Sequence, residues 1–445
     1  MSHPDKARQF QQDAERAGWH DGAVWHVRAR RDAAAAAVTD WNALRDHAAQ
    51  VRAHTLSRLD HYVAQLADHA VANGATVHWA TDAAALRTTV GELLAKARVR
   101  RVVKSKSMLT EECGLNAHLE TTGVEVIDTD LGERIVQLRG ERPSHIVMPA
   151  LHLKRGDVGD TFHRHMRTPP GETDPTRLTR AARHDLRGRF LAAEAGITGV
   201  NFALADSGTF VVCTNEGNAD LGAHLPKLHI LCMGIDKVIP RQADLPVFLR
   251  LLARSATGQP ITAYTSLFKR PAPGTEMHVV IVDNGRTTVL RDGQMRPALG
   301  CIRCGACLNT CPVYRRSGGH SYGADSLPGP IGAVLSGARD ARKHVDLAHA
   351  STLCGSCGAV CPVKVPLPAQ LLELRRRGAG ADGWKDKAMR AVLGHVLAHP
   401  ERARWWGELG ARVQKVLPEA VGGRALPEVS ADGFRDGVKG LLEGE

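Results

Sequence analysis

The sequence predicts an α/β domain with a mainly parallel sheet, then a cysteine-rich helical module and a helical tail. Short apolar runs alternate with amphipathic segments between residues 74 and 297. Two similar cysteine motifs follow at 301–314 and 351–364, and helical periodicity returns from residue 366. The 445 residues suffice for two or three domains with a sizeable core.

Residues 1–73 are predicted to form an N-terminal helical arm. Within this arm, residues 41–72 have the pattern of one long amphipathic helix, because apolar side chains recur at spacings of three and four from Leu44 to Ala70. The first 40 residues have a weaker pattern, compatible with helix or loop.

The α/β domain is predicted over residues 74–297. The segment 201–215 contains two apolar runs joined by Asp206, Ser207 and Gly208, which is a hairpin signal and predicts an antiparallel edge. The other expected elements are helices at 82–97 and 110–123, a polar and then helical segment at 157–196, and strands at 74–80, 101–104, 124–129, 145–150, 229–235, 261–267 and 277–284.

The chain carries a formal net charge of +11, but its Lys and Arg residues are scattered and no aromatic-interleaved nucleic-acid motif accompanies them. We expect a solvated basic surface that permits docking of an acidic protein or peripheral contact with an anionic membrane. No apolar run reaches the roughly 20 residues of a membrane span, and the N-terminal sequence lacks a hydrophobic signal core, so we expect a cytoplasmic protein. In that reducing compartment, ten cysteines favour metal or redox chemistry over disulfides.

The first cysteine motif has the spacing C-x2-C-x2-C-x3-C-P, which is typical of bacterial ferredoxins. Soft thiolate ligands suit iron–sulfur clusters or zinc, but structural zinc usually takes two C-x2-C pairs separated by a loop. The second motif repeats the spacing, with Ser351 where its first cysteine is expected. The seven motif cysteines are Cys301, Cys304, Cys307, Cys311, Cys354, Cys357 and Cys361.

In a ferredoxin run the cysteine before the proline binds the other cluster, so two [4Fe–4S] clusters with crossed ligands are expected. The first cluster takes Cys301, Cys304, Cys307 and Cys361, and the second takes Cys311, Cys354 and Cys357. The second cluster is therefore one thiolate short. Three explanations remain open: its fourth iron carries the Ser351 oxygen, water or a remote side chain; it is a three-iron cluster; or the position is left for a substrate or partner.

These motifs define a predicted α-helical ferredoxin-type module at 298–378 and a helical C-terminal region at 379–445. The 42 residues between Cys311 and Cys354, 312–353, are rich in Gly and Pro. The flanking segments are helical in pattern, unlike the compact β-rich unit of small ferredoxins. The C-terminal region contains Trp384, Trp405 and Trp406.

Two further groups of polar residues are candidate sites in the α/β domain. Lys104 and Lys106 follow a strand and precede a helix, so they are candidates for holding an anion; the alternative is a solvated basic loop. Polar residues also stand at both ends of the second run of the hairpin, and strand ends are where open α/β sheets usually bind ligands. If the two ends converge, Glu216 or Asp206 is the candidate general base, and Ser207 and Asn218 are anion-binding candidates; the alternative is turn geometry.

From about residue 40 to its end, the chain resembles the lactate utilization protein B family. The resemblance rests on "VKSKSMLTEECGLNAHLE" at 103–120, "ETTGVEVIDTDLGERIVQLRGERPSHIVMPALH" at 120–152, "ITGVNFALADSGTFVVCTNEGNADL" at 197–221, and the two cysteine motifs with "PGPIGAVL" between them. The second motif commonly lacks the eighth cysteine in this family, which implies that Ser351 is a family trait. The family often has an apolar residue where Cys113 stands here.

The resemblance implies that the α/β region is a LUD domain, related to the fold of sugar-phosphate isomerases and CoA transferases. It implies a three-protein system that oxidises L-lactate to pyruvate, with a second cysteine-rich iron–sulfur protein and a smaller LUD protein as partners. The expected role of this chain is electron transfer. The alternatives are that the chain itself binds and oxidises lactate through LUD residues and an open cluster, or that it senses an anion or redox state. No G-x-G-x-x-G follows a strand, so no flavin or nicotinamide motif supports hydride transfer in this chain.

Overall fold

The computed structural model describes residues 1–323, 327–379, 384–399, 401–402, 404–407 and 409. The chain divides into two compact units, residues 1–377 and 378–445. Helix α20 (Trp384–Leu397) is described in the second unit, and most of the predicted C-terminal helical region lies outside the described residues. No helix within the described ranges is long and apolar enough to cross a membrane.

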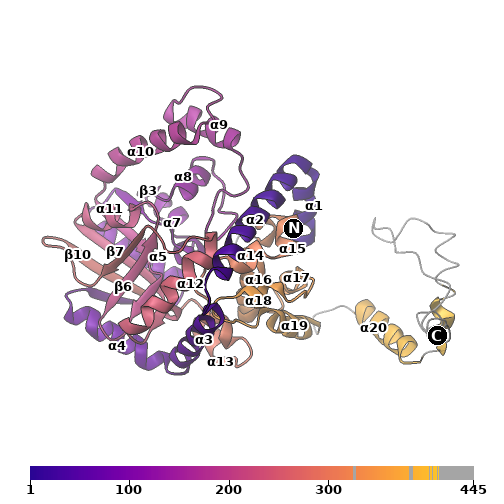
Figure 1. The fold of residues 1–445 in the computed structure, drawn as a ribbon. Helices are drawn as coiled ribbons and strands as arrows, with labels where there is room; N and C mark the ends of the chain where they lie inside the picture. Colours follow the sequence, from indigo (N-terminus) through magenta and orange to yellow (C-terminus); the bar gives the residue numbers. More distant parts are fainter. Residues whose placement is uncertain (324–326, 380–383, 400, 403, 408, 410–445) are drawn as a thin grey trace. The chain divides into compact units, whose positions relative to one another are not determined.

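A six-stranded parallel sheet forms the centre of the α/β region (Figure 1). Every neighbouring pair of its strands runs parallel, as the alternation of strands and helices predicts. All seven residues of β7 and all five of β4 are buried, because these central strands are covered on both faces. In spatial order the strands are β1 (Thr76–Ala80), β10 (Glu276–Val282), β7 (Leu228–Gly234), β4 (Ala195–Gly199), β2 (Arg101–Lys104) and β3 (Glu125–Asp128).

Alternate side chains of the sheet enter different cores. Ile230 and Cys232 of β7 pack in the core under α5 (Ala83–Lys96) and α7 (Leu115–Thr121), whereas Leu231 and Met233 enter the core shared with the second sheet. Helix α10 (Pro175–Leu191) covers β2 and β3 through Leu186 and Phe190. Helix α11 (Asn218–His224) lies so close to β4 that a Cβ on Gly196 would fall 1.8 Å from the carbonyl oxygen of Gly222.

The predicted hairpin belongs to a separate four-stranded sheet with the order β8-β5-β6-β9. Strands β5 (Phe202–Leu204) and β6 (Thr209–Thr214) pair antiparallel, as the Asp-Ser-Gly turn predicts. Strand β9 (Tyr264–Phe268) pairs antiparallel with β6, and β8 (Val238–Ile239) pairs parallel with β5. The buried face of this sheet shares one continuous core with the cysteine module.

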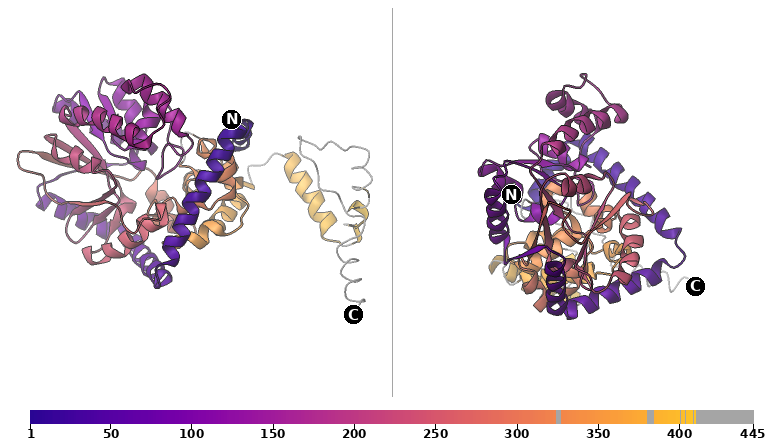
Figure 2. Two further views of the ribbon diagram at one scale, coloured as in Figure 1. Left: turned by 45° about the horizontal axis from the view of Figure 1, so that its top comes forward. Right: turned by 90° about the vertical axis from the view of Figure 1, so that its left-hand side faces the viewer.

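The N-terminal region is helical and packs on both halves of the first unit. Helix α2 (Ala14–Ala36) contacts α12 (Leu245–Thr257) of the α/β region and two helices of the cysteine module, and α1 (His3–Gln12) also lies against that module (Figure 2, left). The single helix predicted over 41–72 is instead α3 (Trp41–Ser57) and α4 (Leu59–Ala72). It breaks at Arg58, whose backbone leaves the helical region at φ −134° and ψ 37°.

The cysteine module is built from short helices, as predicted. Two of them lie within the motifs and pack against each other: α14 (Ala306–Asn309) and α18 (Ser356–Val360). The others are α15 (Pro312–Ser317), α16 (Gly329–Arg339), α17 (Val345–His349), α19 (Leu367–Gly378) and the 3₁₀ turns η3 (Arg296–Gly300) and η4 (Gly319–Tyr322).

Three local predictions for the α/β region were wrong. Residues 145–150 form no strand, because the buried His145 ring accepts hydrogen bonds from the N–H groups of Val147 and Met148 and so holds a compact turn. The helix predicted at 110–123 is two helices, α6 (Met108–Glu112) and α7, separated at Gly114 with φ +63°. The helical segment expected at 157–196 ends earlier, and its last residues begin strand β4.

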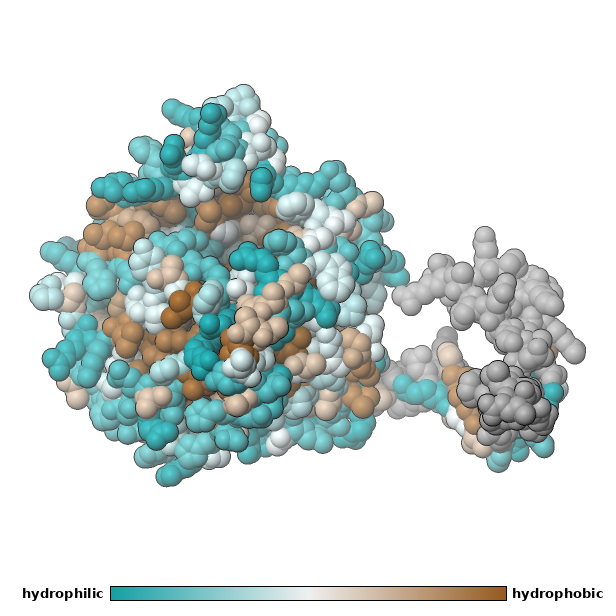
Figure 3. Space-filling model, viewed as in Figure 1, coloured by the Kyte–Doolittle hydropathy of each residue, from teal (hydrophilic) through white to brown (hydrophobic). Residues whose placement is uncertain are grey.

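The remaining elements connect these layers: α8 (Leu131–Leu138), α9 (Arg155–Met166), α13 (Arg286–Arg291) and the 3₁₀ turns η1 (Ile235–Lys237) and η2 (Gln242–Asp244). The face drawn in Figure 3 is covered mainly by hydrophilic side chains, with hydrophobic ones gathered in patches between them.

Candidate functional site

The two cysteine motifs share one local backbone geometry. Arg303 and Leu353, each directly before a cysteine, adopt left-handed conformations with φ 60° and 55°. The glycines after those cysteines, Gly305 and Gly355, also have positive φ values, 76° and 84°. Each glycine is the N-cap of a short helix, α14 or α18, which carries the next cysteine. The repeat in sequence is therefore also a repeat in structure.

Backbone N–H groups donate to cysteine sulfurs in both motifs, including three bonds of 3.3–3.4 Å. The N–H of Arg303 donates to Cys301 Sγ at 3.3 Å, and the N–H of Tyr314 donates to Cys311 Sγ at 3.4 Å. The third such bond joins the Val365 N–H to Cys361 Sγ at 3.3 Å. Hydrogen bonds of this kind stabilise negative charge on sulfur and tune iron–sulfur centres.

Mutual electrostatics place the motif cysteines in two groups that adjoin at Cys307 and Cys357. Burial raises the pKa of the Cys304 thiol, and the charges of Cys301 and Cys361 raise it further. Burial likewise raises the pKa of Cys307, with Cys301 as its strongest charged neighbour. We call Cys301, Cys304, Cys307 and Cys361 the inner cysteine group.

The remaining three motif cysteines form what we call the outer cysteine group: Cys311, Cys354 and Cys357. Burial raises the pKa of Cys357 to about 12, and the charges of Cys311 and Cys354 add to this shift. Cys354 differs, because it is exposed and its pKa is lowered by the Ser356 N–H and the Thr352 hydroxyl. The outer group is thus open to solvent on one side.

These residues fit iron–sulfur groups. All ten cysteines are free thiols, and the seven in the motifs offer only soft sulfur donors. Buried thiols with raised pKa values need a metal to hold them as thiolates, and iron supplies that charge. Among the described residues, no three His, Cys, Asp or Glu side chains converge on the position of a single ion. A cluster does not need such convergence, because it holds its thiolates on separate irons.

A cavity of about 590 Å³ lies at the carboxyl ends of β2, β4 and β7 and extends to the first cysteine motif. Its lining combines residues of the α/β region with Arg303 and Cys304. The cavity therefore borders the inner cysteine group. Its charged and polar lining residues include Lys106, Glu112, Asp130, Glu216, Asn218, Lys237, Arg286 and Arg303.

Of the two candidate bases, Glu216 and Asp206, only Glu216 lines the cavity. Partial burial raises its pKa to about 7, and the neighbouring Asp130 carboxylate contributes to the shift. One of its oxygens accepts a hydrogen bond from the Leu131 N–H at 3.0 Å. Lys106 also lines the cavity, but its ammonium donates to Asp130 and to the Val147 carbonyl, each at 2.9 Å. Asn218 donates to the Thr129 hydroxyl at 3.2 Å.

Three cations in the cavity wall were missed in the sequence: Lys237, Arg286 and Arg303. Burial lowers the pKa of Lys237 to about 8, and the positive charge of Arg303 lowers it further, against the effect of Asp236. Arg303 is itself 3.7 Å from Asp236, a fully buried carboxylate at the end of β7. The sequence offered one signal for Lys237, its position shortly after the buried strand predicted at 229–235. Nothing in the spacing of the motif marks Arg303.

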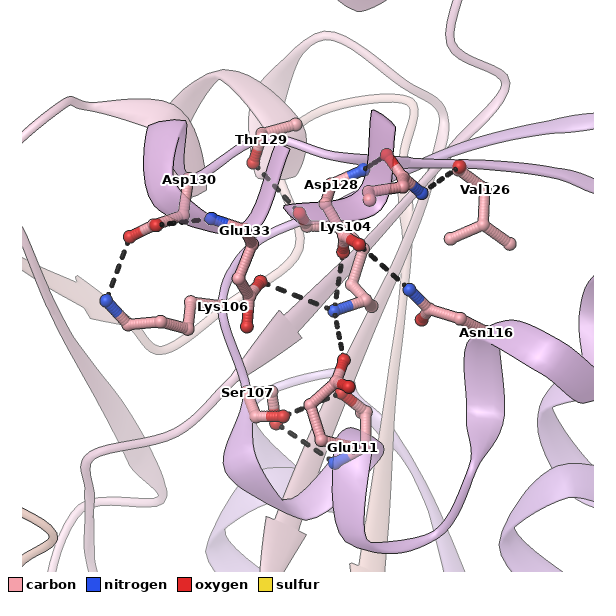
Figure 4. A network of polar contacts seen from close by, with 12 residues as sticks. Lys104, Lys106, Ser107, Glu111, Asn116, Val126, Asp128, Thr129, Asp130 and Glu133 are labelled. Atoms are coloured by element: carbon pink, nitrogen blue, oxygen red, sulfur yellow. Dashed lines mark hydrogen bonds and ion pairs between the residues drawn. The ribbon is translucent and has the colours of Figure 1, made fainter. Parts of the chain in front are cut away.

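Lys104 does not line the cavity, which corrects its prediction as an anion ligand. Its side chain is 0% exposed, and its ammonium lies 2.7 Å from Asp128, 3.4 Å from Glu111 and 3.6 Å from Glu133 (Figure 4). Burial favours a lower pKa, but the three carboxylates outweigh it and raise the pKa of Lys104 well above its usual range. Lys104 is thus the charged centre of a buried acidic cluster.

The two polar ends of the hairpin do not converge, which corrects a second expectation. Asp206, Ser207 and Gly208 form the turn before β6, whereas Glu216 and Asn218 follow its other end. Asp206 accepts a hydrogen bond from the Gln242 N–H at 2.9 Å, and the Ser207 carbonyl accepts one from Asn73 at 2.9 Å. The six residues of β6 separate the ends, so Asp206 and Ser207 stabilise the turn outside the cavity.

The three cysteines outside the motifs lie in the α/β region. Cys113 and Cys232 are buried in one core, and burial raises the pKa of each thiol to about 12. Cys213 lines the cavity at the end of β6, and burial raises its pKa to about 11. Cys113 and Cys232 therefore serve as packing residues of that core.

Comparisons with known proteins agree with this division. A family model described as LUD domain matches residues 63–289, and one described as 4Fe-4S dicluster domain matches residues 297–365. The second match contains all seven motif cysteines, so the chain carries an iron–sulfur binding domain.

Several curated proteins are similar over most of their length. Lactate utilization protein B from Exiguobacterium sp. is 46% identical over 350 residues, covering 77% of this chain and 74% of that protein. The protein of the same name from Macrococcus caseolyticus is 44% identical, covering 80% and 75%. The Escherichia coli protein named uncharacterized electron transport protein YkgF is 40% identical, covering 90% and 88%.

One solved structure, a DUF162 family protein from Deinococcus radiodurans, aligns with 50% of this chain and 98% of its own. Its TM-score is 0.29 and its identity 15%, values too low to support a functional comparison.

Proposed function

The chain belongs to the LUD-domain iron–sulfur proteins of the lactate utilization protein B family, and from this membership we propose that it is the electron-transfer component of a multiprotein system that oxidises L-lactate to pyruvate. The observation that carries the proposal is the division of seven cysteines into two adjacent groups. Each group would hold one cluster, and a bound cluster supplies one-electron transfer at low energetic cost.

The arrangement of the two groups supports a relay. Cys307 of the inner group lies close enough to Cys357 of the outer group for the charge of one to raise the pKa of the other. The inner group is largely enclosed by protein, whereas Cys354 of the outer group reaches the surface. Electrons would therefore enter or leave the chain at the outer group. Its partners would be the second cysteine-rich iron–sulfur protein and the smaller LUD protein of such a system.

A second candidate function rests on the cavity: the chain itself binds the 2-hydroxy acid. Lys237 and Arg303 would hold the carboxylate of the substrate, and Glu216 would take the proton of its hydroxyl group. With a pKa of about 7, Glu216 suits proton transfer near neutral pH. The cavity borders Cys304 and hence the inner group, whereas the sequence had suggested the cluster that lacks a cysteine.

Anaerobic EPR spectroscopy with iron and sulfide quantitation separates these functions. Protein reconstituted with iron and sulfide is titrated with L-lactate, first alone and then with the partner proteins. Reduction that needs the partners supports the relay, whereas reduction by lactate alone supports the second candidate. Zinc in place of iron would contradict both.

Two variants test the second candidate function. Under the second candidate, Glu216→Gln abolishes reduction by lactate alone. The matched control is Asp206→Asn, which changes a carboxylate outside the cavity at the far end of the same hairpin and leaves reduction unchanged.

A further inference from the structure

Ser351 occupies the position in the second motif that Cys301 occupies in the first. Cysteines follow Cys301 after three, six and ten residues, and cysteines follow Ser351 at the same intervals. The left-handed residue and the left-handed glycine also recur at equal distances, as Arg303 and Gly305 in one motif and Leu353 and Gly355 in the other. The backbone that follows Ser351 thus has the same conformation as the backbone that follows Cys301.

The side chains at the two positions have the same hydrogen bond. The Arg303 N–H donates to Cys301 Sγ at 3.3 Å, and the Leu353 N–H donates to Ser351 Oγ at 3.1 Å. Both bonds run from the backbone two residues later, so they orient oxygen and sulfur in the same way. The Ser351 hydroxyl accepts this bond and still has its own proton and a further lone pair for a ligand role.

Ser351 also lies beside the outer cysteine group. A small hollow in the surface is lined by Ser351 together with Cys311, Cys354 and Cys357. Thr352 and Ser356 line the same hollow, but their hydroxyls already have partners. The Ser356 hydroxyl is bonded to that of Thr310, and the Thr352 hydroxyl to the Cys354 thiol.

The main chain of Ser351 is fixed on both sides. Its N–H donates to the His349 carbonyl at 2.8 Å. Its carbonyl accepts a hydrogen bond from the Arg375 guanidinium at 2.5 Å, and the same guanidinium donates to Ala348 at 2.9 Å. This places a positive charge next to Ser351, and a positive charge favours an oxygen that loses its proton.

We infer that Ser351 Oγ is the fourth protein ligand of the iron–sulfur cluster held by Cys311, Cys354 and Cys357. The inference rests on the two-cluster assignment of the proposed function. On binding iron, the hydroxyl releases its proton to solvent, and the alkoxide oxygen forms the bond. Oxygen is a harder donor than sulfur and stabilises ferric iron, so the outer cluster has a lower reduction potential than its all-thiolate equivalent.

Two substitutions test the ligand directly, with Ser356→Ala as the matched control in the same hollow. Ser351→Ala removes the donor, and mild anaerobic oxidation then takes one iron from the outer cluster. The iron content falls from about eight to about seven per chain and the EPR signal of a three-iron cluster appears. Wild type and Ser356→Ala keep their iron under the same treatment.

Ser351→Cys replaces oxygen by sulfur at the same position. Its new thiol is alkylated by iodoacetamide at least about tenfold more slowly in the cluster-loaded protein than after iron is chelated, because a coordinated thiolate is not a free nucleophile. The reduction potential of the outer cluster rises in this variant. Peptide mass spectrometry assigns the alkylation to position 351, because the motif cysteines also become free when iron is chelated.

Either of two results overturns the inference: equal alkylation rates of Ser351→Cys with and without iron, or loss of iron from Ser351→Ala that matches wild type. Either result differs from a failure of the proposed function. In that case the wild-type chain itself would bind no iron, whatever the variants do.

Discussion

Arg303 Nη2 lies 3.7 Å from Asp236 Oδ2, and this ion pair joins the first cysteine motif to the carboxyl end of β7. Asp236 also accepts from Arg286 Nε at 2.6 Å, so one buried carboxylate holds two arginines. Burial favours a higher pKa for Asp236, but the surrounding cations outweigh it and hold the pKa well below its usual range. The cavity and the inner cysteine group are therefore tied through a single charged residue.

We predict that Asp236→Asn destabilises the protein by about 3–5 kcal/mol, because the buried Arg303 loses its counter-charge and Arg286 keeps only Glu112 as its partner. The free energy of unfolding is measured by urea titration at equal iron content. Asp40→Asn removes an exposed carboxylate that pairs with Arg250, and it should change stability little. Equal effects of the two substitutions would contradict this role of Asp236.

We predict that anion binding in the cavity weakens as pH rises from 6 to 9. Glu216, with a pKa of about 7, gains negative charge over this interval, and Lys237, with a pKa of about 8, loses its positive charge. Both changes disfavour a carboxylate ligand. Calorimetric titration with lactate or pyruvate measures the affinity at each pH.

The same titration distinguishes the cavity lysine from other lysines. Lys237→Met should weaken binding about tenfold, equivalent to about 1.4 kcal/mol. Lys227→Met, at an exposed position outside the cavity lining, should leave the affinity unchanged. A pH-independent affinity, or equal losses in the two variants, would exclude this cavity as the anion site.

Lys104→Met is expected to lower the free energy of unfolding by about 3–5 kcal/mol, because Asp128, Glu111 and Glu133 then lose their buried cation. The anion affinity of the folded fraction should stay at the wild-type value. Adding Glu133→Gln should recover part of the lost stability. Burial and the neighbouring carboxylates raise the pKa of Glu133 and so favour its neutral form, which Gln resembles. A stable Lys104→Met variant with lost anion binding would restore the original prediction for Lys104.

Crossed ligation predicts which cluster each cysteine variant loses. Cys361→Ala should remove the inner cluster although Cys361 belongs to the second motif, and Cys311→Ala should remove the outer one. Each variant then retains about half of the iron, and the two EPR spectra differ. Cys113→Ala, in the α/β core, is the control and keeps all iron. If Cys361→Ala and Cys354→Ala lose the same cluster, each motif binds its own cluster.

The sheet was predictable because its strands are short apolar runs between helices, and the β5–β6 hairpin because Asp-Ser-Gly marks its turn. Cysteine spacing was equally informative, since it is fixed by the local geometry of the ligand loops. Residues 145–150 misled the prediction because a buried histidine, and not a neighbouring strand, accepts their N–H hydrogen bonds.

The cavity was harder to predict than the cysteines. Lys104 and Lys106 are two residues apart, yet one is enclosed by carboxylates and the other faces the cavity. That difference depends on α6 and α8, which supply Glu111 and Glu133. Arg303 and Lys237 come together only when the cysteine module packs on the sheet. Such contacts between distant segments leave no local pattern in the sequence.

Two N-terminal arginines cap the helix of the second cysteine motif. Arg45 donates to the carbonyls of Ala359 and Cys361 at 2.6 and 3.0 Å, and Arg31 donates to that of Val360 at 3.0 Å. These are the carbonyls at the end of α18, which have no partners within a short helix.

This capping makes the cysteine module depend on the N-terminal helices. Arg45 and Cys361 are 316 positions apart in the chain, yet they are in direct contact. A cysteine module excised without residues 14–57 would therefore lack the two arginines that donate to the loop of its last cysteine.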